Sequence, residues 1–162
     1  MLRLGLVNGT SGNVSAREGA LVRITPSALP YPGMTVNDLV TITMDGAVLA
    51  GEHEPSSEWR VHVAVYAARQ DARVLVHTHS EHATAWSESG EPLSMAPGSS
   101  VLTAPFAPSG SDEIATATVA ALGDRQAVLL GHHGVLAVGE TPGMALEVCA
   151  AVERAAEAAR GA

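Results

Sequence analysis

A chain of 162 residues, 46% of them hydrophobic, is long enough for one domain with its own apolar core. Its nine basic residues are all arginine, which excludes chemistry that needs a lysine amine: Schiff-base catalysis, pyridoxal phosphate attachment and the P-loop. The formal net charge of -8 argues against a nucleic-acid binder, which needs a basic face, but allows a small anionic substrate held by backbone amides and a metal ion.

Short apolar runs alternate with longer segments of helical spacing. Trp59, Val63 and Tyr66 recur at helical spacing after a Pro-Ser start, and an Asp-Gly pair between two apolar runs indicates a hairpin turn. In chain order, the expected strands cover 20–25, 39–44, 47–50, 72–78, 101–104, 126–133 and 134–139, and the expected helices cover 55–70, 80–89, 111–123 and 141–160. This mixture, with some strands joined by hairpins, predicts one layered α/β domain over residues 1–162 with a partly antiparallel sheet.

The compartment is indicated by a single cysteine, Cys149, which excludes an intramolecular disulfide and favours a reducing environment. No apolar stretch reaches membrane-spanning length, and the apolar part of the N-terminal segment is too short for a secretory signal. We therefore expect a cytoplasmic protein with no membrane partner.

Two apolar runs end in histidines. His77 and His79 lie two apart at the end of one strand, so their side chains point to the same face, as metal ligands often do. A catalytic zinc site uses three protein ligands and an open position. Either His132 or His133 can supply the third ligand, but not both, because neighbouring residues on a strand face opposite ways. Gly134 would let the backbone turn sharply beside them.

Taken alone, one His-x-His pair is more often two polar side chains at a solvent-facing strand end, and the second cluster is what favours a metal. The other histidines carry weaker signals. His62 lies one helical turn beyond Glu58 and is able to orient that carboxylate, although a structural role on the helix face is favoured. His53 and His82 are interpreted as a surface loop residue and a helix residue near the site.

Glu58 stands at the predicted start of a helix, in the segment "PSSEWR". A helix N-terminus offers unpaired amides to anions, and Ser56 and Ser57 lie in the same turn. The segment is able to place a general base beside a phosphate site. The alternative is an ordinary capped helix start with an acidic first turn.

Two loops upstream are rich in amides and hydroxyls. The segment 8–17, "NGTSGNVSAR", contains Gly12 and Asn13, and the segment 24–33 contains Ser27. Such loops are able to bind an anion through backbone amides, although ordinary turns have the same composition.

Five segments occur in one order: "GTSGNVSAR", "ITPSALPY", "PSSEWRVH", "VHTHSEHATAW" and "LLGHHGVLAV". Together they resemble the class II aldolase/adducin family, most closely its L-fuculose-1-phosphate aldolases, from about Leu4 to the final helix. The resemblance implies a three-layer α/β/α sandwich with a mixed, largely antiparallel central sheet. It also implies a homo-oligomer, with a tetramer favoured, whose active sites lie between subunits.

The resemblance further implies a zinc ion held by His77, His79 and His133, with Glu58 as the acid/base. The implied substrate is a phosphorylated 2-ketose, cleaved to dihydroxyacetone phosphate and an aldehyde through a metal-stabilised enediolate, which needs no lysine. The implied phosphate site consists of Gly12, Asn13, Ser27, Ser56 and Ser57.

Other members of the family act on the same kind of metal site. Pentulose-phosphate 4-epimerases usually have an aspartate where Glu58 stands and a single-histidine spacing at the second cluster, so "SSEW" and "HHG" favour an aldolase. Sugar-acid phosphate decarboxylases, a methylthioribulose-phosphate dehydratase and a non-catalytic adducin-like domain are the further alternatives. The family's tyrosine proton donor has no counterpart between "HTHS" and "TAPF", and Tyr31 and Tyr66 fit that role poorly.

Overall fold

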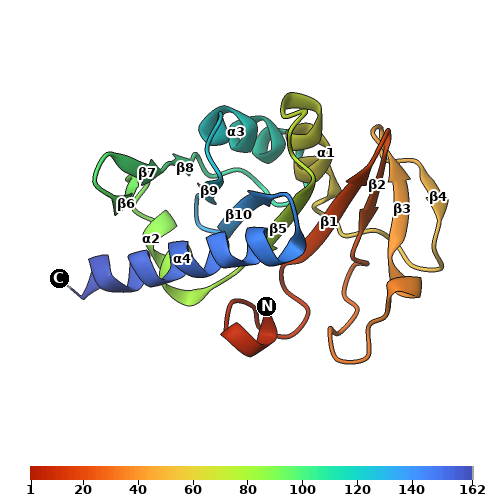
Figure 1. Cartoon of the computed structure of the whole chain (residues 1–162), viewed down its shortest axis with the longest axis horizontal. Helices are drawn as coiled ribbons and strands as arrows, with labels where there is room; N and C mark the ends of the chain where they lie inside the picture. Colours follow the sequence, from red (N-terminus) through yellow and green to blue (C-terminus); the bar gives the residue numbers. More distant parts are fainter. Residues whose placement is uncertain (162) are drawn as a thin grey trace.

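The computed structural model describes residues 1–161, and its strands and helices alternate along the chain (Figure 1). The strands are β1 (Asn13–Glu18), β2 (Leu21–Ile24), β3 (Val40–Thr43), β4 (Val48–Ala50), β5 (Val74–Thr78), β6 (Leu93–Ala96), β7 (Ser99–Val101), β8 (Thr103–Ala104), β9 (Ala127–Leu130) and β10 (Gly134–Gly139). The helices are α1 (Trp59–Ala68), α2 (Glu81–Ser87), α3 (Asp112–Leu122) and α4 (Pro142–Arg160), with short 3-10 turns η1 (Leu2–Leu4) and η2 (Val36–Asp38).

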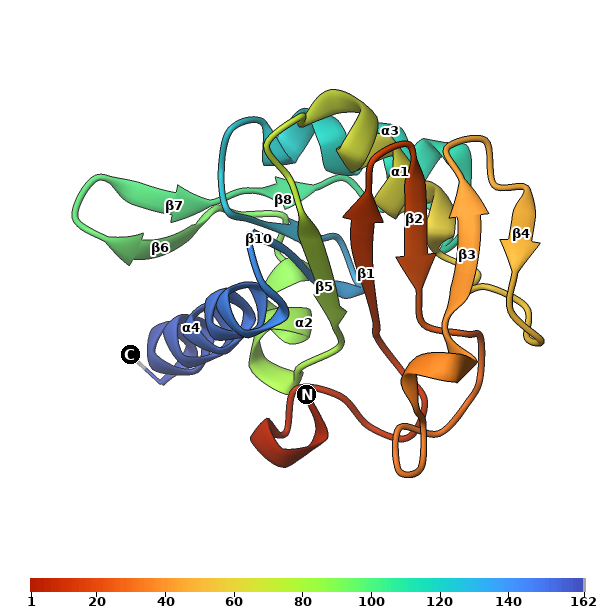
Figure 2. The ribbon, with the colours of Figure 1, turned by 45° about the vertical axis from the view of Figure 1, so that its right-hand side comes forward.

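One large sheet forms the middle layer, in the order β4-β3-β2-β1-β5-β10-β9-β8. Its pairs are antiparallel except the parallel pair of β8 and β9. Helices α1 and α3 pack together on one face, whereas α4, with α2 beside it, covers the β5–β10 part of the other (Figure 2). The predicted three-layer sandwich with a mixed, largely antiparallel sheet is confirmed.

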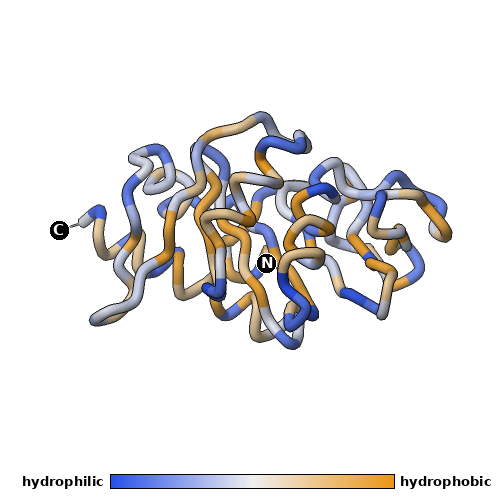
Figure 3. The backbone as a smooth tube through the Cα atoms, turned by 90° about the horizontal axis from the view of Figure 1, so that it is seen from above, coloured by the Kyte–Doolittle hydropathy of each residue, from blue (hydrophilic) through white to orange (hydrophobic). Residues whose placement is uncertain are grey.

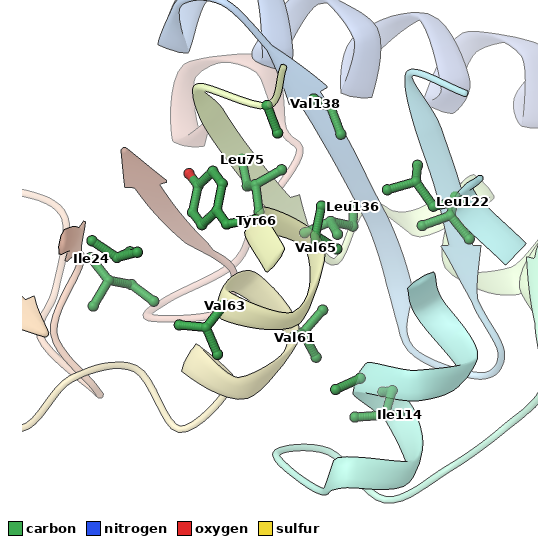
Figure 4. Close-up of a cluster of buried hydrophobic side chains, with 14 of the residues drawn as sticks. Ile24, Val61, Val63, Val65, Tyr66, Leu75, Ile114, Leu122, Leu136 and Val138 are labelled. Carbon is green, nitrogen blue, oxygen red and sulfur yellow. The ribbon is translucent and has the colours of Figure 1, made fainter. Parts of the chain in front are cut away.

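The central strands are apolar on both sides because helices cover both faces of the sheet. On β10, Leu136 packs into the α1/α3 cluster (Figure 4), while the neighbouring Val135 packs toward α4. On β5, Leu75 likewise packs into the α1/α3 cluster and Val76 packs toward α4. Figure 3 shows the hydrophobic colour along these inner strands and the hydrophilic colour mainly in the connections. The strand ends therefore carry the polar chemistry, and β5 and β10 lie side by side.

The prediction for residues 8–17 was wrong in part, because Asn13–Glu18 form strand β1 between β2 and β5. The strand was hidden because Asn13 and Ser15, on its inward face, are polar and buried, which reverses the usual alternation. The expected strand 101–104 is also divided, since Val101 ends β7 and Thr103 begins β8.

The other expected elements are present with shifted ends. Helix α1 begins at Trp59 rather than at residue 55, because Pro55 forms an isolated bridge with Pro26 and only Ser57 and Glu58 form a turn before the helix. The hairpin of β6 and β7 had not been expected. Within residues 1–161, no helix combines the length and apolar character that crossing a membrane requires.

Candidate active site

Four side chains from three parts of the sequence converge at one end of the sheet. His77 is the penultimate residue of β5 and His79 follows the strand, while His133 lies in the turn between β9 and β10. Glu58 precedes the first residue of α1 and makes no side-chain capping bond to that helix. One potential ligand atom from each of the four lies within 4.8 Å of all the others.

The three imidazoles face one another edge to face. Their ring centroids are separated by 4.6 Å for His77 and His79, 4.9 Å for His77 and His133, and 4.6 Å for His79 and His133. The Nε2 atoms of His77 and His79 are 2.7 Å apart. Oxygens of Glu58 lie 3.2 Å from Nε2 of His77 and 3.0 Å from Nε2 of His133. Each ring therefore turns its Nε2 into a common space.

A hydrogen bond to strand β10 fixes the orientation of the His77 ring. Its Nδ1 donates a hydrogen bond to the backbone carbonyl of Val135 on β10, at 2.8 Å. This is the type of contact that a metal-ligating histidine usually makes through its second nitrogen, because it fixes the ring and leaves Nε2 free. The contact between the neighbouring strands β5 and β10 thus fixes the orientation of the His77 ring.

The second histidine pair lies in a turn, so the prediction that it ends a strand was wrong. Gly131, His132 and His133 follow β9 as turn residues, and His132 has a positive φ of 58°. His132 lies outside the cluster and packs edge to face with Phe106, with ring centroids 5.5 Å apart, whereas His133 joins the cluster. Gly134 is not the sharp-turn residue: it begins β10, where a Cβ would collide with the carbonyl of Thr78.

Glu58 is 7% exposed, and its carboxylate is surrounded by donors. Burial by itself raises the pKa of this carboxyl, but the charge of His77 and hydrogen bonds from His133 and His77 outweigh burial and hold the pKa far below its ordinary value. Asn13 Nδ2 donates to Oε2 at 2.8 Å, and Ser109 Oγ donates to Oε1 at 2.9 Å. The side chain is an ionised acceptor.

The pKa values of His79 and His77 are shifted in opposite directions. Burial, followed by the charges of His77 and His133, lowers the pKa of His79 to about 3, so that ring is neutral and offers a lone pair. Burial opposes a charge on His77 as well, but the adjacent Glu58 raises the pKa of this ring above its ordinary value. Nε2 of His77 and the carboxylate of Glu58 therefore face each other as donor and acceptor, in the space that a metal ion would occupy.

The donor set fits a divalent metal ion. Three imidazole nitrogens with a carboxylate in reach are the ligands of catalytic zinc sites, and the bond from His77 to Val135 supplies the outer support such ligands need. The four residues accordingly form a possible metal site whose ion type is left open by the ligands themselves.

A cavity of about 260 Å³ opens beside the cluster. Neither lysine nor arginine is among its lining residues, and hydroxyl and amide groups predominate. The residues predicted for an anion site all line it, together with three of the four cluster residues and further loop residues: Thr10, Ser11, Gly12, Asn13, Pro26, Ser27, Ala28, Ser56, Ser57, Glu58, His79, Ser109 and His133.

Gly12 permits the closest approach in this cavity. It has a φ of 74°, and a Cβ would lie 2.6 Å from the carbonyl oxygen of His77 and 2.8 Å from Val7. The hydroxyl of Tyr31 donates to the carbonyl of Gly12 at 2.6 Å, and its distance to the carbonyl of Ser11 is 3.2 Å. The loop is thus held against the strand that carries His77.

Sequence reasoning missed Ser109, which reaches Glu58 from the loop before α3. Its neighbour Gly110 has a φ of 76° and packs where a Cβ would be 2.8 Å from the carbonyl of Ser57. The only available signal was a Ser-Gly pair just before a capped helix, which is common in loops.

The model of the family described as Class II Aldolase and Adducin N-terminal domain matches residues 1–159. The chain belongs to this family. L-fuculose phosphate aldolase of Escherichia coli O6:H1 is 43% identical over 148 residues, which cover 85% of this chain and 66% of that protein. This member of the class II aldolase family therefore spans slightly less than two thirds of the length of that relative.

Two further members of the family extend the comparison. The 5-methylthioribulose-1-phosphate/5-deoxyribulose-1-phosphate aldolase of Rhodospirillum rubrum is 38% identical over 161 residues, covering 95% of this chain and 72% of that protein. A solved structure of L-fuculose 1-phosphate aldolase has a TM-score of 0.92 and 33% identity, covering 97% of this chain and 78% of that chain. The expected class II aldolase fold and the resemblance to fuculose-phosphate aldolases are confirmed.

Proposed function

We propose that the protein is a zinc-dependent class II aldolase that cleaves a phosphorylated 2-ketose, of the L-fuculose-1-phosphate type, to dihydroxyacetone phosphate and an aldehyde. The observation that carries the proposal is the convergence of three imidazoles and one ionised carboxylate beside a cavity lined by neutral donors. The similarity to aldolases of sugar 1-phosphates supports the substrate class.

In this proposal His77, His79 and His133 hold the zinc ion, which when bound supplies the positive charge that stabilises an enediolate. Glu58 is the acid/base. It moves the proton on the hydroxyl-bearing carbon next to the carbonyl of dihydroxyacetone phosphate: it removes this proton in the synthetic direction and returns it in cleavage. A buried carboxylate with few competing waters suits that transfer.

The phosphate group is assigned to the cavity beside the metal ligands. Ser57 is exposed to this cavity, whereas the hydroxyl of Ser56 accepts a bond from the backbone of Glu58 at 3.3 Å. Backbone and side-chain donors of Gly12, Asn13 and Ser27 complete the proposed site. Neutral donors replace the lysine that the chain lacks.

The proposal extends to a cytoplasmic homotetramer. The single thiol, Cys149, is fully buried on α4, as suits a protein of a reducing compartment. Phe106 is 67% exposed beside His132, close to the metal cluster, where a neighbouring subunit would cover it. Tyr66 is buried, and the hydroxyl of Tyr31 donates a hydrogen bond to the backbone carbonyl of Gly12. Neither tyrosine is therefore free to act as proton donor to the part of the substrate that leaves as the aldehyde.

The test is a panel of ketose 1-phosphates incubated with zinc-loaded and metal-depleted protein. Release of dihydroxyacetone phosphate, followed by its coupled reduction, is expected with zinc and is expected to disappear after chelation. Products are identified by mass and by stereochemistry. An epimerised pentulose 5-phosphate, loss of carbon dioxide or loss of water as the only reaction would replace the aldolase proposal with one of the other family activities.

A further inference from the structure

A buried line of hydrogen bonds leads from the α1 layer to the carboxylate of the candidate site. The hydroxyl of Tyr66 is 2.9 Å from Ser15 Oγ, and Ser15 Oγ is 2.6 Å from Nδ1 of His62. Nε2 of His62 is 2.5 Å from Oδ1 of Asn13, whose Nδ2 is 2.8 Å from Oε2 of Glu58. Strand β1 and helix α1 supply the four residues that precede Glu58 in this line.

The donor and acceptor capacities of the groups fix the direction in which each hydrogen bond of the line is donated. A carboxylate only accepts, so Asn13 must turn its N–H groups to Glu58 and its carbonyl to His62. That carbonyl also only accepts, so His62 must carry its hydrogen on Nε2. Nδ1 of His62 is then a lone pair, and Ser15 must donate to it. The hydrogen of Ser15 is thereby used, so Tyr66 is the donor in the 2.9 Å contact, and its hydroxyl also lies 3.1 Å from the backbone carbonyl of Ser15.

The groups behind Asn13 are buried away from water that might substitute for a lost partner, and Asn13 itself is nearly buried at the edge of the cavity. His62 and Tyr66 are 0% exposed, Ser15 is 1% exposed and Asn13 is 3% exposed. Burial, followed by the charge of His77, lowers the pKa of His62 to about 3, so the ring stays neutral. Both ring nitrogens of His62 therefore have protein partners, and neither belongs to the metal cluster or to the cavity lining.

We propose that His62 is a positioning residue that locks the side-chain amide of Asn13 with its N–H groups toward Glu58 and the anion cavity. The inference rests on the proposed function, which it deepens by joining the acid/base to the phosphate site through one amide. Nδ2 has two hydrogens: one is bound to Glu58, and the second is available to an anion in the cavity that Asn13 lines.

Without His62 the amide loses the donor to its Oδ1, and the contact with Glu58 alone favours its present orientation. A rotated amide would place Oδ1 against Oε2 of Glu58, and two acceptors would then face each other at the 2.8 Å distance that now joins donor and acceptor. The carboxylate would shift or lose a partner, and the cavity would present a carbonyl oxygen to the phosphate. Both effects weaken the site while leaving the three metal ligands in place.

The first test is spectroscopic and does not depend on turnover. Two-bond proton–nitrogen correlation spectra of 15N-histidine-labelled, zinc-loaded protein are recorded at pH 7, with the His62→Gln spectrum to assign the signal. The neutral Nε2–H tautomer is expected for His62. The Nδ1–H tautomer or an imidazolium would overturn the inference, because neither is compatible with the direction of the line.

The second test compares His62→Leu with His62→Gln, and uses His53→Gln, a substitution in a surface loop, as the matched control. Leucine removes the donor to Asn13, whereas glutamine keeps an N–H group that is able to reach it. Zinc content is expected to remain at wild-type level in all three. In His62→Leu, affinity for inorganic phosphate and proton exchange of dihydroxyacetone phosphate should each fall by about 10- to 100-fold.

His62→Gln should retain both quantities within about threefold, on the scale of one weakened hydrogen bond. Wild-type phosphate affinity and exchange in zinc-loaded His62→Leu would overturn the inference, as would equal losses in the Gln and Leu variants. If the wild type neither binds phosphate nor exchanges the proton, the proposed function fails by itself. Crystal structures of wild type and His62→Leu then decide the positioning claim, and an unmoved Glu58 carboxylate overturns it.

Discussion

Two histidines of this fold are buried to almost the same extent and are used in opposite ways. On the β1–α1 side, both ring nitrogens of His62 are occupied by Ser15 and Asn13. At the end of β5, only Nδ1 of His77 is occupied, by Val135, and Nε2 faces the other ligands. The comparison teaches that a buried histidine is able to bind a metal only where the fold leaves one nitrogen without a fixed neutral partner.

The largest expected effect is on the metal-binding side of this comparison. His77→Ala removes the ligand that the sheet itself orients, so metal content should fall from about one ion per chain to background. Inductively coupled plasma measurement of dialysed protein checks this result. Full metal content in His77→Ala would show that the cluster around Glu58 is not the metal site. His82→Ala, which changes a histidine outside the cluster, is the control and should keep its metal.

The second largest expected effect distinguishes two roles of Glu58, metal ligand and general acid/base. Glu58→Gln keeps the shape of the side chain but removes its charge and its basicity. Aldol cleavage should fall by about 10²–10⁴-fold, the usual contribution of a general acid/base, while zinc content stays near wild type. Cleavage assays on protein of measured zinc content make the comparison. Loss of zinc in parallel with activity would instead make Glu58 a ligand only.

A smaller effect is expected in the anion cavity. Ser57→Ala removes an exposed hydroxyl that lines the cavity, so the Michaelis constant should rise about 10-fold with little change in kcat, as for one hydrogen bond to a charged group. Steady-state kinetics and phosphate inhibition measure this, with Ser89→Ala as the control. An unchanged Michaelis constant would move the phosphate site elsewhere.

The smallest effect tests the turn between β9 and β10. His132 packs edge to face with Phe106 and lies outside the metal cluster, so His132→Gly, which suits its positive φ, should leave metal content unchanged and alter kcat/KM by less than about twofold. The same assays check it. A variant of His132 that lost its metal would reverse the assignment within the His-His pair.

Much of the framework could be predicted from local patterns. The apolar runs of β5, β9 and β10, the helical spacing around Tyr66 and the long Ala-rich α4 all identified elements, because local periodicity reflects which faces are buried. The ordered motifs placed Glu58 and the three histidines as candidates, and these four side chains do lie together.

What could not be predicted depends on contacts between distant residues. Strand β1 presents Asn13 and Ser15 to the interior, which is favourable only because His62 and Tyr66 stand opposite them. Ser109 reaches Glu58 from 51 residues away, and no local pattern gives that contact. The His132–His133 turn was mistaken for a strand end because the apolar run before it gave no sign of where pairing stops.

Proton exchange by dihydroxyacetone phosphate decides whether the cluster of Glu58 and the three histidines is the centre of an aldolase. Dihydroxyacetone phosphate is incubated in deuterated buffer with zinc-loaded protein, and the loss of the signal of the proton alpha to the carbonyl is followed by NMR. We predict exchange by the wild type, even where cleavage is slow, and a decrease of about 10²–10⁴-fold in zinc-loaded Glu58→Gln. Exchange by the zinc-loaded wild type no faster than that of metal-depleted protein would contradict the account.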